Sequence, residues 1–124
     1  LVQEYIKKGN IVIKRLSAEY QAKVSRLVEI YPHLDRGEAE VICLTLQEKQ
    51  QEVLLDDSMG RKVAELHTLT PSGSLRVVLL AYHRKIISKD ELMKTVRQLL
   101  DAGLYLGADV LEEFYELVKK MERR

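Results

Sequence analysis

Three carboxylates, Glu38, Asp56 and Asp57, are the residues of this 124-residue chain whose types and spacing could do chemistry. The two aspartates follow the apolar run of residues 53–55, and Glu38 opens an earlier apolar stretch. Acidic side chains held close together repel, which raises their pKa values unless a cation neutralises them. Mg²⁺ and Mn²⁺ prefer such oxygen ligands. The pattern points to a divalent-metal site, with helix-terminus, cap and turn roles as the alternatives for the same acids.

A buried helix and a short strand must position these acids. Residues 39–46 are mostly apolar, which is typical of a helix buried on several sides, and Gly37 can start that helix. The uninterrupted apolar run of residues 53–55 predicts a strand of a parallel sheet that is covered on both faces. In open α/β sheets the site lies beyond the carboxyl ends of the strands, so the two aspartates lie where chemistry is usually done.

The charged neighbours of these acids divide into those that can face the site and those that cannot. Each helical residue turns by about 100 degrees, so Glu40 lies about 200 degrees round the helix from Glu38 and cannot readily face the same site. Arg36, Arg61 and Lys62 flank the acids and could bind phosphates. The alternative for them is a salt bridge, which arginines beside aspartates form more often.

The remaining chain is expected to be mostly helical, and Ser17, Ser58 and Ser88 are residues that favour helix N-caps. From the turn cluster PSGS onward, beginning at Pro71, the pattern is helical throughout. The predicted elements are helices over residues 1–8, 18–30, 58–67, 75–86, 89–102 and 108–122, with short strands over residues 11–14 and 68–70.

Composition excludes several classes of protein. The formal net charge of +1 gives no global basic field for nucleic acid. The single cysteine, Cys43, excludes a disulfide framework and favours a reducing compartment. No apolar run is long enough to span a membrane and no secretory signal opens the sequence, so we expect a cytoplasmic protein. The three histidines are scattered, and P-loop, dinucleotide-binding and serine-hydrolase motifs are absent from the sequence.

The ordered motifs GEAEVICLTLQ, LLDDSMGR, GSLRVVLLAYHRKII and LLDAGLYLGADVLEEFYELV resemble a prokaryotic branch of the PIN-domain proteins, related to the VapC-type toxins. The similarity covers nearly the whole chain and implies a single PIN-like domain over residues 1–124. It also implies a three-layer α/β/α fold with a short parallel sheet and a helical C-terminal third. Active members of the family are ribonucleases whose Mg²⁺ or Mn²⁺ is held by three or four acids.

Carried onto this sequence, the resemblance places the family's acids on Glu38, on Asp56 with Asp57 beside it, and on Glu4 within VQEYI. These acids would place the metal against a phosphodiester and activate a water for hydrolysis. The resemblance thus implies RNA as substrate and a role as the toxin of a toxin–antitoxin pair. An antitoxin protein and a second copy of the chain, in a homodimer, are the further partners it suggests.

One family feature has no counterpart here, the opening strand that ends in an aspartate. Because the sequence begins at Leu1 inside a helical pattern, we expect that this strand was lost from a longer protein. A second hypothesis follows, that the chain is a catalytically inactive PIN-like module for protein interaction or nucleic-acid binding. A third, a DNA-binding regulator built on the C-terminal helices, is weakened by the lack of a basic recognition helix.

Overall fold

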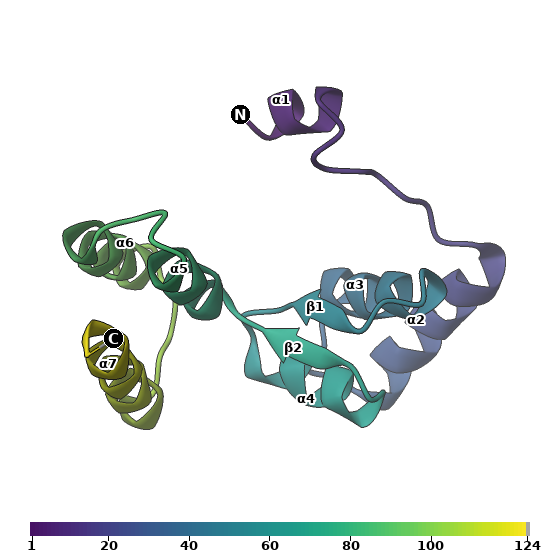
Figure 1. The fold of residues 1–124 in the computed structure, drawn as a ribbon. Coiled ribbons are helices and arrows are strands. Elements are labelled where there is room, and N and C mark those ends of the chain that lie inside the picture. Colours follow the sequence, from purple (N-terminus) through teal and green to yellow (C-terminus); the bar gives the residue numbers. More distant parts are fainter. Residues whose placement is uncertain (124) are drawn as a thin grey trace. The chain divides into compact units, whose positions relative to one another are not determined.

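The computed structural model describes residues 1–123 and forms two compact units, Leu1–Pro71 and the part from Ser72 onward (Figure 1). The first unit contains α1 (Val2–Lys7), α2 (Ala18–Ile30), α3 (Arg36–Gln47), β1 (Glu52–Leu54) and α4 (Ser58–Leu66). Strand β2 (Thr70–Ser72) crosses the division, and the second unit contains α5 (Ser74–His83), α6 (Lys89–Asp101) and α7 (Ala108–Glu122).

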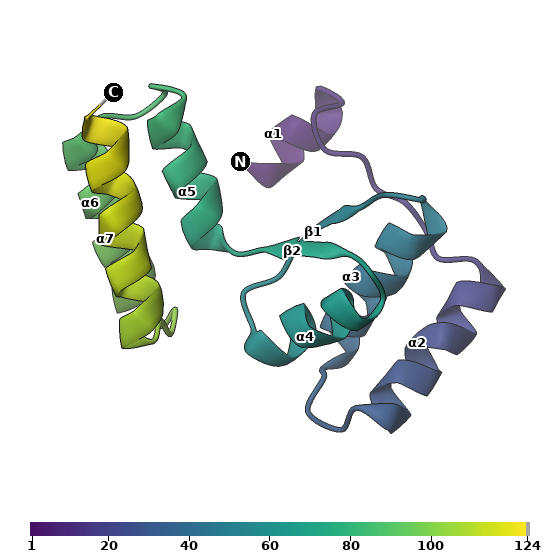
Figure 2. The same cartoon turned by 60° about the horizontal axis from the view of Figure 1, so that its bottom comes forward.

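Strands β1 and β2 form a two-stranded parallel sheet. The backbone N–H of Thr70 donates to the carbonyl of Gln51 over 2.9 Å, which fixes the register at the start of the pair. In Figure 2 the two strands run along one side of α3 and α4. The combination of helices with a short parallel sheet confirms the predicted α/β class.

The core of the first unit lies between α2, α3, α4 and β1. Its largest fully buried side chains belong to Val24, Leu34, Ile42, Cys43 and Val63. Burial raises the pKa of the Cys43 thiol, as expected of a packing residue rather than a reactive one.

Strand β1 is covered on one face and not on both, so this part of the prediction is wrong. Val53 and Leu55 are 4% and 7% exposed, whereas Leu54 between them is 65% exposed. Side chains of a strand point alternately to its two faces, and here α3 and α4 pack against one of them. The apolar run indicated burial correctly only for alternate residues.

The predicted strand over residues 11–14 is also absent: Val12 and Ile13 are 66% and 73% exposed and in no regular element. A β-prone run needs a partner strand, and within residues 1–123 β1 pairs with β2 alone. The second strand begins at Thr70 rather than residue 68 because Thr68, with a φ of +60°, turns the chain after α4.

The predicted helices are present, with changes at their ends. Helix α3 begins at Arg36 after the N-cap Asp35 rather than at Gly37, and α5 ends at His83, so Ile86 lies outside it. The Ser17 hydroxyl accepts from the N–H of Tyr20 at the start of α2, and Ser88 forms a capping box with Glu91 at α6. Helix α4 is capped by Asp57 rather than by Ser58, which is its first helical residue.

The second unit is a helical cluster with a core of its own. Lys89 at the start of α6 pairs with Glu122 at the end of α7 at 2.5 Å. No helix within residues 1–123 is long and apolar enough to cross a lipid bilayer. The buried residues of the α5–α7 core are Leu79, Leu92, Val96, Phe114 and Val118.

Candidate active site

Glu38 is fixed by a capping box at the start of α3. The backbone N–H of Glu38 donates to Asp35 Oδ1 over 2.8 Å, and the N–H of Asp35 donates back to Glu38 Oε1 over 3.3 Å. This reciprocal pair satisfies two backbone donors that a helix N-terminus leaves open. One carboxylate oxygen of Glu38 therefore has a structural role.

The other oxygen, Glu38 Oε2, is buried and has no hydrogen-bond donor among the described residues. It lies against α4, where a Cβ built on Gly60 would come 2.3 Å from it and 3.6 Å from Leu55 Cδ2. A buried acceptor without a donor costs free energy, about 1–3 kcal/mol and more for a charged group. A cation or a water at this oxygen would remove that cost.

Asp57 brings a second negative charge near Glu38. Its side chain caps α4 by accepting from the backbone N–H of Met59 over 3.1 Å, which fixes it at the turn between β1 and α4. Burial raises the pKa of the Glu38 carboxyl most strongly, and the negative charges of Asp35 and Asp57 raise it further. The Asp35 N–H acts in the opposite direction by stabilising the charged form.

Asp56 is exposed in the turn after β1, two residues beyond the end of the strand and one residue before the N-cap of α4. Its backbone carbonyl accepts a hydrogen bond from the guanidinium of Arg61, so this arginine ties the β1–α4 turn to α4. Lys62, the next residue of α4, is exposed. The guanidinium of Arg61 thus contacts the backbone of the turn that carries Asp56 and Asp57.

The other predicted residues lie elsewhere on the first unit. Arg36, in the first turn of α3, pairs with Glu40 at 3.8 Å, which confirms that Glu40 does not share the direction of Glu38. Glu4 lies in the first turn of α1, a helix with no buried residue. Of the predicted acids, Asp57 is the one whose charge acts on the Glu38 carboxyl, whereas Glu4 lies on a helix that buries none of its residues.

Asp35 and Gly60 are residues of this site that the sequence reasoning did not single out. Asp35 stands three residues before Glu38, and this spacing of an N-cap acid and a glutamate is the signature of a capping box. No sequence pattern marks Gly60, because a side chain at this position is excluded only by the close approach of Glu38 on α3 to α4.

The chemistry of these acids fits a hard divalent cation. Mg²⁺ keeps several waters and often uses only one or two protein carboxylates, and Glu38 Oε2 with Asp57 supplies that number. Among residues 1–123, however, no three His, Cys, Asp or Glu side chains are grouped as metal ligands. The fit is therefore to a cation that is held by a pair of acids and by water.

A short parallel sheet, with carboxylates beyond the end of one strand, places the chain among α/β proteins with an acidic site at the sheet edge. A model of the PIN domain family (DUF3368) matches residues 1–120, and the chain belongs to that family. Membership indicates a nuclease-type function on nucleic acid, and PIN domains generally use divalent metal ions. No curated protein and no solved structure matches the chain.

Proposed function

We propose that the chain is a Mg²⁺- or Mn²⁺-dependent ribonuclease, with Glu38 and Asp57 as the pair of acids that hold the cation and Asp56, next to Asp57, as a further acid of the site. The observation that carries the proposal is the buried, donor-free Oε2 of Glu38 in a PIN-family chain, with the charge of Asp57 acting on the same carboxyl. Bound divalent metal would supply an activated water and neutralise the charge that develops on the phosphate.

The protein's own groups would prepare the site. The capping box holds Glu38 Oε1, so that Oε2 stays directed at α4, and the cap of α4 holds Asp57. Arg61 and Lys62 would bind the phosphates of the RNA, with Arg61 also ordering the turn that carries Asp56. Arg36, which pairs with Glu40 on another side of α3 from Glu38, is not assigned to this site. Glu4 as a further catalytic acid, the toxin role, an antitoxin and a homodimer remain predictions of the resemblance.

Cleavage of a fluorogenic oligoribonucleotide, with Mn²⁺ or with EDTA, tests the proposal. We expect metal-dependent cleavage that falls roughly hundredfold or more in Asp56→Asn and in Glu38→Gln, because each removes a negative charge from the cation's surroundings. Glu40→Gln, which changes an exposed acid paired with Arg36, is the control that should keep its activity. Equal cleavage by all four proteins would overturn the assignment.

A second candidate function is a catalytically inactive PIN-like module that binds a protein or nucleic-acid partner. The observation that favours it is that residues 1–123 contain no group of three acids able to hold a metal. Metal-dependent RNA cleavage by the purified chain, abolished by Asp56→Asn, would exclude this candidate. A folded chain that neither binds Mn²⁺ nor cleaves RNA would support it.

A further inference from the structure

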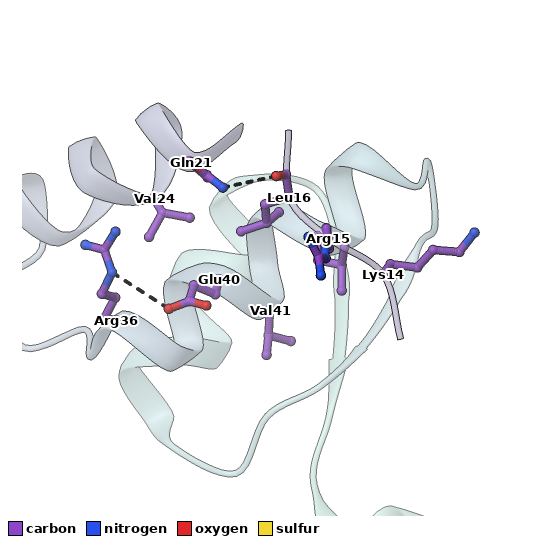
Figure 3. Close-up of a pocket in the computed structure, with 9 residues that line it drawn as sticks. Lys14, Arg15, Leu16, Gln21, Val24, Arg36, Glu40 and Val41 are labelled. Atoms are coloured by element: carbon purple, nitrogen blue, oxygen red, sulfur yellow. Dashed lines mark hydrogen bonds and ion pairs between the residues drawn. The ribbon is translucent and has the colours of Figure 1, made fainter. Parts of the chain in front are cut away.

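A pocket of about 530 Å³ lies in the first unit, between α2, α3 and the segment that leads into α2 (Figure 3). Its volume is within the usual range for ligand pockets. It lies on a different face of α3 from Glu38, since Glu40 is among its lining residues. The pocket is lined by Lys14, Arg15, Leu16, Gln21, Val24, Arg36, Glu40, Val41 and Leu44.

The wall of this pocket is held by side-chain amides. Gln47, at the end of α3, donates to the carbonyl of Arg15 over 2.9 Å and accepts from the N–H of Ser17 over 2.8 Å. The amide of Gln21 donates to the carbonyl of Leu16 over 3.2 Å. These hydrogen bonds fix the irregular segment before α2 against α2 and α3. The segment that forms one wall of the pocket is therefore held by tertiary contacts.

The floor of the pocket is aliphatic. Val24 is buried, Leu16 and Leu44 are half-buried, and Val41 is 40% exposed, which is unusual for a valine on the central helix of a core. No aromatic side chain lines the pocket. It therefore offers a surface for a branched aliphatic side chain and no ring on which a nucleic-acid base could stack.

The rim carries positive charge that the chain itself does not fully neutralise. Within residues 1–123 the guanidinium of Arg15 makes no ion pair, and Arg36 pairs with Glu40 only at 3.8 Å with both side chains at least half exposed. Exposed pairs of this kind contribute little and exchange readily. Lys14 points away from the others and pairs with Glu48 at 3.7 Å (Figure 3).

We propose that this pocket binds an acidic peptide segment of a partner protein, with a leucine-like side chain on the floor and carboxylates at Arg15 and Arg36. Charge complementarity at the rim and an aliphatic floor select this occupant over RNA, which would bring phosphates but would find nothing to stack on. The proposal does not depend on nuclease activity, because the pocket shares neither Glu38 nor the aspartates.

Amide chemical-shift mapping on the ¹⁵N-labelled full chain, in EDTA, tests this site. The probe is the peptide acetyl-Asp-Leu-Glu-Asp-Leu-Glu-amide, with two matched peptides in which the acids become Asn and Gln or the leucines become Ala. We expect saturable shifts at Leu16, Val41 and Leu44 with the first peptide only. Arg15→Glu should weaken binding by about threefold to tenfold, whereas Arg26→Glu, an exposed change on α2 outside the pocket, should not.

Three results would overturn the proposal. The first is the absence of shifts at the pocket residues, and the second is equal binding of the neutral peptide or of the Ala peptide. The third is that a short uridine oligoribonucleotide of the same formal charge shifts the amide signals of the same residues as strongly. The pocket would then bind polyanions in general. Because the readout contains no cleavage step, failure here would leave the nuclease proposal untouched.

Discussion

Glu38 Oε2 occupies the space that the side chain of any residue other than glycine at position 60 would need, since a Cβ on Gly60 would come 2.3 Å from it. This contact joins the first turn of α3 to the first turn of α4. It places the buried carboxylate beside the turn that carries Asp56 and Asp57. The absence of a side chain at position 60 is thus a condition for the carboxylate to lie where it does.

Gly60→Ala should push the Glu38 carboxylate out of its position. We expect weaker Mn²⁺ binding and only a small change in the free energy of unfolding without metal, because the atom that must move is the end of a flexible side chain. Urea unfolding with and without Mn²⁺ measures both. Gly107→Ala is the matched control, because a Cβ there meets nothing within 4 Å. It should leave Mn²⁺ binding unchanged, since its only expected cost is a poorer N-cap for α7. Equal effects of the two substitutions would contradict the steric role of Gly60.

Glu38→Gln should stabilise the metal-free protein at neutral pH, because the pKa of the Glu38 carboxyl is raised in the folded state, chiefly by burial. A raised folded-state pKa means that this group's stabilisation is fully present below the unfolded-state pKa. It is lost as the pH rises through the raised folded-state value. The glutamine can still accept from the N–H of Asp35, so the cap is retained.

The pH dependence of urea unfolding in EDTA measures this effect. The free energy of unfolding of Glu38→Gln should exceed that of the wild type at pH 7, and the difference should shrink as the pH falls toward 4. Glu40→Gln, at an exposed carboxylate, should show no comparable trend. If Glu38→Gln is less stable than the wild type at pH 7 in EDTA, the buried carboxylate does not destabilise the metal-free protein.

Asp35→Ala should destabilise the first unit by about 0.5–2 kcal/mol, because it removes the capping box at α3. Asp35→Asn keeps an oxygen acceptor for the N–H of Glu38 and should recover most of that loss. Urea midpoints of the two variants provide the measurement. If the asparagine variant is as unstable as the alanine variant, the charge of Asp35 rather than its cap is what matters.

Core truncations should act on separate clusters. Ile42→Ala and Leu92→Ala each remove a fully buried side chain and should cost about 2–5 kcal/mol, the first in the Leu1–Pro71 core and the second in the α5–α7 core. Native-state hydrogen exchange would resolve where protection falls. If each variant lost protection equally in both cores, the two cores would unfold as one cooperative unit.

The sequence was most informative where the determinants are local. Serines 17 and 88 predict the starts of α2 and α6, because a cap requires only residues a few positions apart. The missing strand at residues 11–14 and the exposed face at Leu54 depend on which segments pair and pack, which periodicity does not encode. The site divides in the same way: its acids are visible in sequence, whereas Gly60 is visible only once α3 and α4 are placed.

A calorimetric titration with Mn²⁺, with Mg²⁺ as competitor, tests the central claim most directly, that Glu38 and Asp57 act together on one cation. It compares the wild-type chain with Glu38→Gln combined with Asp57→Asn, substitutions that keep the side-chain shapes and the cap of α4. We predict saturable binding by the wild type that Mg²⁺ displaces, and a loss of roughly tenfold or more in the double variant. Unchanged binding in a folded double variant, or no binding by the wild type, would contradict it.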